Sequence, residues 1–332
     1  MVFKITLYIF LSFTLLYLCS SISYKLGFLD KPNKRIIHSK PTAYTGGIAL
    51  SIILIFSVII FDNFYEKISL IISIAFLVSI VGLVDDRYHL NIGGKLSLQI
   101  IPIFYMVIYE NLTLYQIGDY DYFNLNLGSF SVPFTILSVL FLVNSFNYFD
   151  GIDGTLGFTL ISVLVILYFL TKDQNIRVFL IILFIPISLF LIFNFSIFNL
   201  PKLFLGDSGS LYLGFVISFY LIFASNQTFV HPILLGWSIV IFVYEFLSIN
   251  ITRLLNRNGL FEAGQDHLHH MIFKQTNSIF LTNLYISLLN ILLFTFGYLS
   301  FLLINPFSSL TLFIIFFLIF LMFRIKLTKK IK

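Results

Sequence analysis

The segment 144–154 carries two carboxamides and two carboxylates at steps of three residues, at Asn144, Asn147, Asp150 and Asp153. Side chains at this spacing lie on neighbouring turns of a helix and can act together. Two glycines in the same segment let the backbone open and approach a ligand. The structural alternative is a helix end at which Asn and Asp act as caps, but four such residues exceed the needs of one terminus.

Asp85 and Asp86 form a second acidic motif, directly before Arg87. Adjacent carboxylates repel each other unless a cation or hydrogen-bond donors lie beside them. The alternative is a solvated helix end next to its own arginine.

A third motif, Gly206-Asp207-Ser208-Gly209-Ser210, precedes an apolar segment. Free N–H groups at a helix N-terminus favour a phosphate, and a carboxylate in the same turn favours a divalent cation. Alternatively, one of the serines only caps the helix.

Histidines make up the fourth motif, His267-Leu-His269-His270, with Arg253 and other basic residues nearby. The spacing is not that of a helical zinc pair and no cysteine accompanies it, so donation to a polyphosphate is the better interpretation, with zinc as the alternative. In the first basic loop, His38 lies upstream of two glycines and would suit a lipid phosphate headgroup.

The rest of the chain is apolar, with a mean hydropathy of +0.99, 59% hydrophobic and 11% charged residues. These values exclude an ordinary soluble domain. Apolar runs close to the length of a membrane-spanning helix predict an all-α polytopic membrane protein with about 10–11 transmembrane helices, forming one domain over 1–332. The runs cover 2–23, 46–61, 68–84, 96–109, 132–148, 155–171, 177–197, 211–225, 231–252, 279–303 and 308–323. The polar segment 110–131 could form a small outer hairpin.

Lysine and arginine are distributed unequally between the two predicted faces. With the N-terminus outside, sixteen of the 20 fall on one face and four on the other, which assigns the basic face to the cytoplasm. The net charge of +5 is therefore a topology signal rather than a sign of nucleic-acid binding. The same face collects the acidic motifs, Glu262, Asp266 and the histidines, so we expect these loops to meet over one cytoplasmic cleft. Carboxylates for a metal, donors for phosphate and a body open to lipid suit phosphoryl transfer.

The four motifs, in this order, resemble the polyprenyl-phosphate N-acetylhexosamine-1-phosphate transferases of the WecA and MraY type, glycosyltransferase family 4. The resemblance covers about residues 25 to 275, and the His-x-His-His ending is similar to the WecA-like branch. It implies an enzyme of the bacterial inner (plasma) membrane that transfers a sugar-1-phosphate from a UDP-sugar to undecaprenyl phosphate. It also implies release of UMP, a requirement for Mg²⁺ or Mn²⁺, and initiation of a lipid-linked cell-envelope glycan.

The resemblance also implies roles for individual residues. Asp207 and Asn147 match positions that hold the metal. Asp150 and Asp153 match residues that shape the nucleotide and metal pocket. Asn144, in the same motif, is expected to bind the substrate. The Asp85-Asp86 pair matches residues proposed to orient or deprotonate the lipid phosphate. Donors to the diphosphate or sugar phosphate are expected at Arg253, His267, His269 and His270. Direct attack by the lipid phosphate is preferred to a covalent aspartyl intermediate, because a phosphate oxygen is already ionised at neutral pH.

Two departures from the family pattern leave the sugar open. The chain has Val243-Tyr244-Glu245 where a proline closely followed by aspartate is frequent, and Gly264-Gln265-Asp266 in place of an Asp-Arg pair. UDP-N-acetylglucosamine is the default donor, with N-acetylgalactosamine or a deoxy-sugar as alternatives. The oligomeric state is also open, a homodimer included. Rival functions are a transporter or flippase of a lipid-linked sugar, a phosphotransferase that uses CDP-activated alcohols, and an inactive scaffold.

Overall fold

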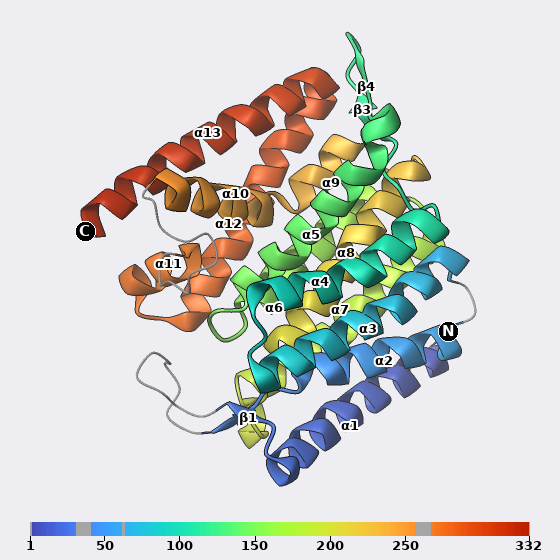
Figure 1. Ribbon diagram of the computed structural model, residues 1–332, viewed down its shortest axis with the longest axis vertical. Helices are drawn as coiled ribbons and strands as arrows, with labels where there is room; N and C mark the ends of the chain where they lie inside the picture. The colour runs from blue at the N-terminus through green and yellow to red at the C-terminus, as the bar shows by residue number, and fades with distance from the viewer. Residues whose placement is uncertain (1, 31–40, 62–63, 256–266, 332) are drawn as a thin grey trace.

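The structure is a computed structural model that describes residues 2–30, 41–61, 64–255 and 267–331, with side chains described up to residue 326. Helices dominate it, as Figure 1 shows, so the predicted all-α fold class is confirmed. Long helices come first and last in the chain and pack into one bundle. The helices are α1 (Val2–Leu26), α2 (Gly46–Ile60), α3 (Glu66–Tyr88), α4 (Ile92–Phe104), α5 (Ser131–Phe149), α6 (Thr155–Leu170), α7 (Gln174–Asn194), α8 (Gly206–Asn226), α9 (Pro232–Ser238), α10 (Val240–Leu255), α11 (Leu268–Thr276), α12 (Ile279–Leu303) and α13 (Pro306–Ile331).

All eleven apolar runs fall on helices. Eight helical segments in the described part of the chain are long and apolar enough to cross a membrane, or nine if the bent pair α9–α10 forms one span. The other two runs form α2 and α6, which have only 15 and 16 residues. The run with Pro102 is continued by a π-helical turn, Tyr105–Tyr109, where the proline has disturbed the regular hydrogen bonding of α4.

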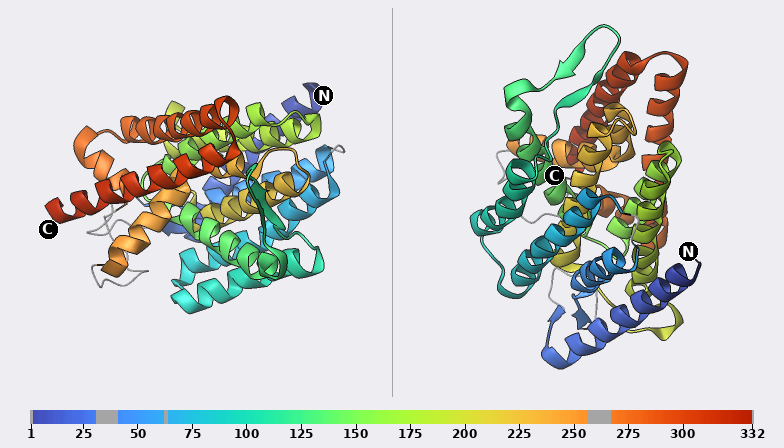
Figure 2. Two further views of the ribbon diagram at one scale, coloured as in Figure 1. Left: turned by 90° about the horizontal axis from the view of Figure 1, so that it is seen from above. Right: turned by 90° about the vertical axis from the view of Figure 1, so that its right-hand side faces the viewer.

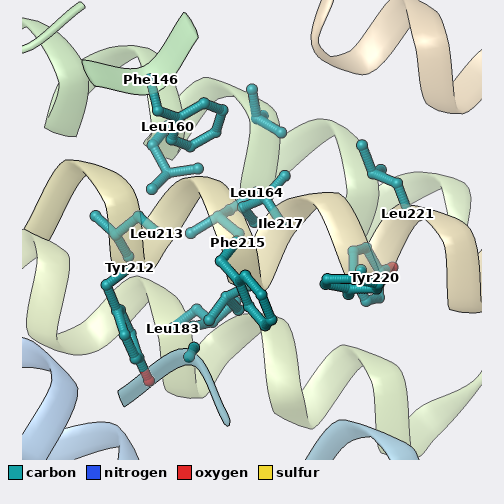
Figure 3. Close-up of a cluster of buried hydrophobic side chains, with 14 of the residues drawn as sticks. Phe146, Leu160, Leu164, Leu183, Tyr212, Leu213, Phe215, Ile217, Tyr220 and Leu221 are labelled. Atoms are coloured by element: carbon teal, nitrogen blue, oxygen red, sulfur yellow. The ribbon is translucent and has the colours of Figure 1, made fainter. Parts of the chain in front are cut away.

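Helix α8 is the centre of the bundle, and its residues from Ser208 to Ala224 are all buried. A helix that is apolar on every side must be covered on every side. Figure 3 shows its side chains against those of α5, α6 and α7. The neighbours approach closely because α8 carries glycines: a Cβ on Gly214 would lie 2.8 Å from the Cα atom of Val143 in α5.

The run predicted over 231–252 is not one straight helix. It breaks between Ser238 and Val240, and α9 and α10 meet at 74°. Asn290 of α12 supplies the hydrogen bonds that the break removes: its Nδ2 donates to the carbonyl of Ser238 (3.1 Å) and its Oδ1 accepts from the N–H of Ile241 (3.4 Å). A break in a helix at membrane depth is tolerated where other protein groups form the missing backbone hydrogen bonds. Asn290 is fully buried at this break and forms them.

Two short antiparallel hairpins complete the described chain. Strands β1 (Leu29–Asp30) and β2 (Thr42–Ala43) pair near the end of α1. Strands β3 (Gln116–Asp119) and β4 (Asn124–Asn126) form the hairpin expected in 110–131. Figures 1 and 2 show this second hairpin projecting from one end of the bundle, with α11 toward the other.

Replacing Asn290 by leucine should therefore destabilise the protein. The change keeps the number of side-chain heavy atoms but leaves buried backbone groups at the helix break without partners, at a cost of about 1 to 3 kcal/mol. Thermal unfolding in detergent would measure it. Thr295→Ala on the same helix is the control, because Thr295 is exposed and bonds only within its own helix. Equal melting temperatures for the two variants would contradict this account of the break.

Candidate active site

The four motifs converge at the end of the bundle opposite the β3–β4 hairpin. The acidic motifs lie at the C-terminal ends of α3 and α5 and the N-terminal end of α8, and the histidines lie on α11. A cavity of about 400 Å³ opens among them. It is lined by side chains from α3, α4, α5, α10, α11 and the connecting loops: Asp85, Leu90, Ile92, Lys95, Leu96, Asn144, Asn147, Tyr148, Gly151, Arg253, His267, His269 and His270.

Asp86 binds the N-terminus of α8. Its carboxylate accepts from the N–H of Asp207 (3.0 Å) and the N–H of Ser208 (3.3 Å). The expectation that these N–H groups would hold a phosphate therefore differs from the structure, in which a side chain of α3 is the anion at the helix end. The turn needs Gly206, whose φ is +71°, because a Cβ there would lie 2.6 Å from Asp86.

Asp85 and Asp207 share one cation, Lys95 of α4. The Lys95 Nζ lies 2.7 Å from a carboxylate oxygen of Asp85 and also forms an ion pair with Asp207. Arg87, the expected neighbour of the acidic pair, instead donates to the carbonyl of Gly27 (3.1 Å). The sequence analysis missed this role of Lys95. The available signal was a lysine close to the N-terminus of a helix, where the helix dipole disfavours a positive charge.

The side chains of Asn147 and Asn144 form hydrogen bonds with residues of other helices and do not cap helix α5. Asn147 Nδ2 donates to the other carboxylate oxygen of Asp207 (2.7 Å) and to Ser210 Oγ (3.0 Å). Asn144 Nδ2 donates to the side chain of Gln99 in α4 (3.2 Å). Asp207 is thus held from two sides, by Lys95 and by Asn147.

Asp150 and Asp153 have different surroundings despite their spacing. Burial raises the pKa of Asp150 well above its usual value, and the negative charges of Asp207, Asp86 and Asp153 raise it further. Asp153 forms an ion pair with Lys202 (2.5 Å) and is not among the residues that line the cavity. Asp150 does not line the cavity either, but Gly151 next to it does, so Asp150 lies closer to the cavity along the chain.

The histidine motif lies on and just before α11, with the three rings grouped together. The rings of His267 and His269 are nearly parallel, with centroids 5.4 Å apart, and His269 and His270 are 4.4 Å apart. His269 is 1% exposed, and burial lowers its pKa well below the usual value, as do the charges of His267 and His270. Its ring lies against Gly151, where a Cβ would be only 2.3 Å from Nε2.

Tyr148 joins the histidines to the basic residue of α10. The Arg253 guanidinium lies 6.0 Å from the centre of its ring, and the ring of His267 makes an edge contact at 5.1 Å. The sequence analysis did not single out Tyr148, and an aromatic residue at the end of an apolar helix gives no signal of its own. Tyr148, Arg253 and the histidines line the cavity and are called the second wall below. The carboxylates of Asp85, Asp86, Asp150 and Asp207 are called the acidic wall, and among them Asp85 lines the cavity itself.

The donor set suits a hard divalent cation in its chemistry. Asp207, Asn147 and Asp150 offer oxygen ligands of the kind that Mg²⁺ prefers, and the pKa of Asp150 is raised by burial first and then by the negative charges of Asp207, Asp86 and Asp153. No group of three His, Cys, Asp or Glu side chains in the described ranges is arranged to hold a metal. The Lys95 ammonium forms an ion pair with Asp207. His38, Glu262 and Asp266, also expected at this site, lie outside the described residues.

Comparison with known proteins is consistent with these motifs. A model of glycosyl transferase family 4 matches residues 68–225. The undecaprenyl-phosphate alpha-N-acetylglucosaminyl 1-phosphate transferase of Escherichia coli O157:H7 is 28% identical over 276 residues, which cover 80% of this chain and 75% of that protein. The probable undecaprenyl-phosphate N-acetylglucosaminyl 1-phosphate transferase of Bacillus subtilis (strain 168) is 27% identical over 315 residues, covering 91% of this chain and 84% of the relative.

The range that matches the family model begins in α3 and ends in α8, so it contains all three acidic motifs, and the relatives extend the similarity over most of the chain. The helices around those motifs include eight or nine candidate membrane spans in the part of the chain that the structure describes. The chain is a multi-pass membrane protein, and its residues 68–225 match glycosyl transferase family 4.

Proposed function

We propose that this protein transfers N-acetylhexosamine-1-phosphate from a UDP-sugar to undecaprenyl phosphate and releases UMP. The observation that carries the proposal is the cavity itself, whose lining brings Asp85 and Asn147, the partner of Asp207, together with Lys95, Arg253 and the three histidines. Walls of opposite charge suit a substrate that is a diphosphate and binds a cation. The printed names of the relatives support N-acetylglucosamine as the sugar and undecaprenyl phosphate as the acceptor.

The proposed reaction needs positioning and charge neutralisation. A phosphate oxygen of the lipid attacks the phosphorus that carries the sugar, and the bond from this phosphorus to the bridging oxygen breaks, so that the oxygen leaves with UMP. Arg253 and the histidines donate hydrogen bonds to the diphosphate, and Lys95 places a positive charge between Asp85 and Asp207. The attacking oxygen is already ionised, so no carboxylate has to form a covalent intermediate.

Mg²⁺ is the proposed cofactor, with Asp207 and Asn147 as the residues that would hold it and Asp150 close by. When bound, it would supply positive charge on the diphosphate. Asp85 would keep Lys95 at the site, and Asp86 would hold α8 so that Asp207 faces the cavity. The chain's own residues thus arrange the donor, while the lipid phosphate arrives from the membrane side.

Lysines and arginines gather at the same end of the bundle as the cavity, which supports a cytoplasmic site in a bacterial inner membrane. Lys95, Lys202 and Arg253 are at the cavity end, whereas Lys67 bonds Glu110 at the hairpin end. We propose that residues 1–332 form one transferase domain, which begins a lipid-linked glycan at this face.

The test is a transfer assay with purified protein, undecaprenyl phosphate, Mg²⁺ and a panel of UDP-sugars. We expect UMP and a lipid-diphosphate-sugar product, with UDP-N-acetylglucosamine as the best donor, and loss of both products on chelation by EDTA. Chromatography of UMP and extraction of the lipid measure the two products separately. A transporter or flippase would release no UMP from any donor, and that result would remove the enzymatic proposal.

Replacing Asp207 by asparagine should lower kcat by about a hundredfold or more, comparable to the loss of one key transition-state electrostatic contact. The asparagine retains an oxygen that can accept from Asn147, so the fold should survive. Asp119→Asn is the matched control, because the side chain of Asp119 is exposed on the hairpin at the other end of the bundle. Similar turnover by the two variants would place Asp207 outside the reaction.

Replacing Gly151 by alanine should lower kcat/KM for the UDP-sugar by about tenfold or more, because displacement of a positioned group is costly even without loss of its chemistry. The new Cβ would lie 2.3 Å from His269 Nε2, so the ring of this residue, which is 1% exposed, must shift from its packed position. Gly236→Ala serves as the control, since its nearest neighbour would be the Phe313 ring at 4.0 Å. Unchanged kinetics in the Gly151 variant would mean that His269 does not need this contact.

A further inference from the structure

A buried ion pair joins the last helix to the helix that leads to the histidines. Glu245 of α10 and Arg324 of α13 form an ion pair in which their side chains are only 2% and 3% exposed. Neither residue lines the cavity. Isolated buried charges are costly and paired ones are seldom a net gain in stability over apolar side chains, so the pair calls for a role beyond stability.

The second oxygen of Glu245 shows what the pair holds. Glu245 Oε1 accepts from the N–H of Leu268 at 3.0 Å, and His267 Nδ1 lies 3.6 Å from the same oxygen, beyond a direct hydrogen bond. Leu268 is the first residue of α11, and its N-cap residue His267 makes no side-chain capping bond. The carboxylate that caps α11 therefore comes from α10.

The cap decides where the histidines lie. Helix α11 has nine residues, and short helices depend on caps and tertiary contacts for their order. Leu268, whose N–H Glu245 accepts, directly precedes His269, which lies against Gly151 next to Asp150. A displacement of the N-terminus of α11 would shift all three rings relative to the acidic wall.

Helix α13 is itself fixed to α10 next to the pair. The Tyr244 hydroxyl donates to the carbonyl of Phe313 (2.5 Å), and the Tyr244 ring contacts Phe313, Phe317 and Phe320. Arg324 follows Phe320 by about one helical turn. The guanidinium is thus presented to Glu245 from a packed helix, not from a free chain end.

We propose that Arg324 and Glu245 are positioning residues for the histidine motif. Arg324 neutralises and orients Glu245, and Glu245 caps α11, so that the C-terminal helix sets the placement of His267, His269 and His270 in the cavity. The role of the histidines as donors to the UDP-sugar rests on the proposed function, but the tie between the helices does not.

The decisive variant replaces both partners, Glu245→Leu with Arg324→Leu. Removal of a buried pair in favour of apolar residues of similar volume is often neutral or stabilising, so we expect a melting temperature at or above that of the unchanged protein. We also expect the amides of α11 to exchange hydrogen for deuterium about tenfold faster, and kcat/KM for the UDP-sugar to fall by about tenfold or more. The KM for undecaprenyl phosphate should change by less than about twofold.

Two further variants complete the test. Arg324→Lys, made in the otherwise unchanged protein, retains a positive charge. It should keep much of the exchange protection of α11 and much of kcat/KM for the UDP-sugar. The outer pair provides the control, Lys67→Gln with Glu110→Gln, since this pair is more exposed and lies at the hairpin end. It should leave both α11 exchange and donor kinetics unchanged.

The outcomes separate the two proposals. A double-leucine variant that keeps its melting temperature, its α11 protection and its donor kinetics would overturn the positioning role. If the unchanged protein releases no UMP from any UDP-sugar, the proposed function fails. The exchange of α11 amides then still decides whether Arg324 and Glu245 hold this helix.

Discussion

Close packing of α3 against α8 determines where the acidic groups can be. A Cβ on Gly82 would lie 2.4 Å from backbone atoms of Asp207 and Ser208, so these helices touch through their main chains. Helix α2 also packs closely on α8, because a Cβ on Gly47 would lie 1.9 Å from the backbone nitrogen of Gly209. At this separation Asp86, one turn beyond Gly82, reaches the N–H groups of α8. Asp207 then faces Lys95 and Asn147, and the position of the acidic groups follows from the close approach of Gly82 to the backbone of α8.

The carboxylates of the acidic wall do not each have a cationic partner of their own. Lys95 lies between Asp85 and Asp207, and Lys202 pairs with Asp153, which leaves Asp150 with acidic neighbours. Arg253 and the histidines belong to the second wall. An anionic substrate alone would meet repulsion at the acidic wall, whereas an anion that carries a cation can meet both walls favourably. This arrangement explains why metal and diphosphate belong together in the proposed function.

The apolar runs predicted the helices well because a spanning helix is encoded by composition and length alone. The sequence also predicted the β3–β4 hairpin, from the polar alternation in 110–131. Pairings between helices could not be predicted in this way. The bond of Asn290 across the break at Ser238 and the ion pair between Glu245 and Arg324 join residues far apart in sequence. A period of 3.6 residues identifies a helix but does not identify which helix its polar residue will face.

The same limit explains the site. Positive-inside counting correctly brought the motifs to one end, because loop charge reports the side of the membrane. It did not separate Asp150 from Asp153, whose equal spacing hides different partners. From the sequence, Tyr244 and Glu245 could be identified only as a departure from the family pattern. Its meaning depends on α13, which lies well beyond the matched range 68–225.

The acidic wall and the second wall come from different parts of the chain. Contacts between their helices must therefore fix the position of one relative to the other. The acidic wall belongs to α3, α5 and α8, within the range that matches the family model, whereas the histidines follow that range. Asn283 of α12 joins the two: its Nδ2 donates to the carbonyl of Asp153 and its Oδ1 accepts from Thr155, both at 2.8 Å. Glu245 and His269 then connect the same region to α11. The distance between the histidines and the acidic wall therefore depends on how these contacts place α11.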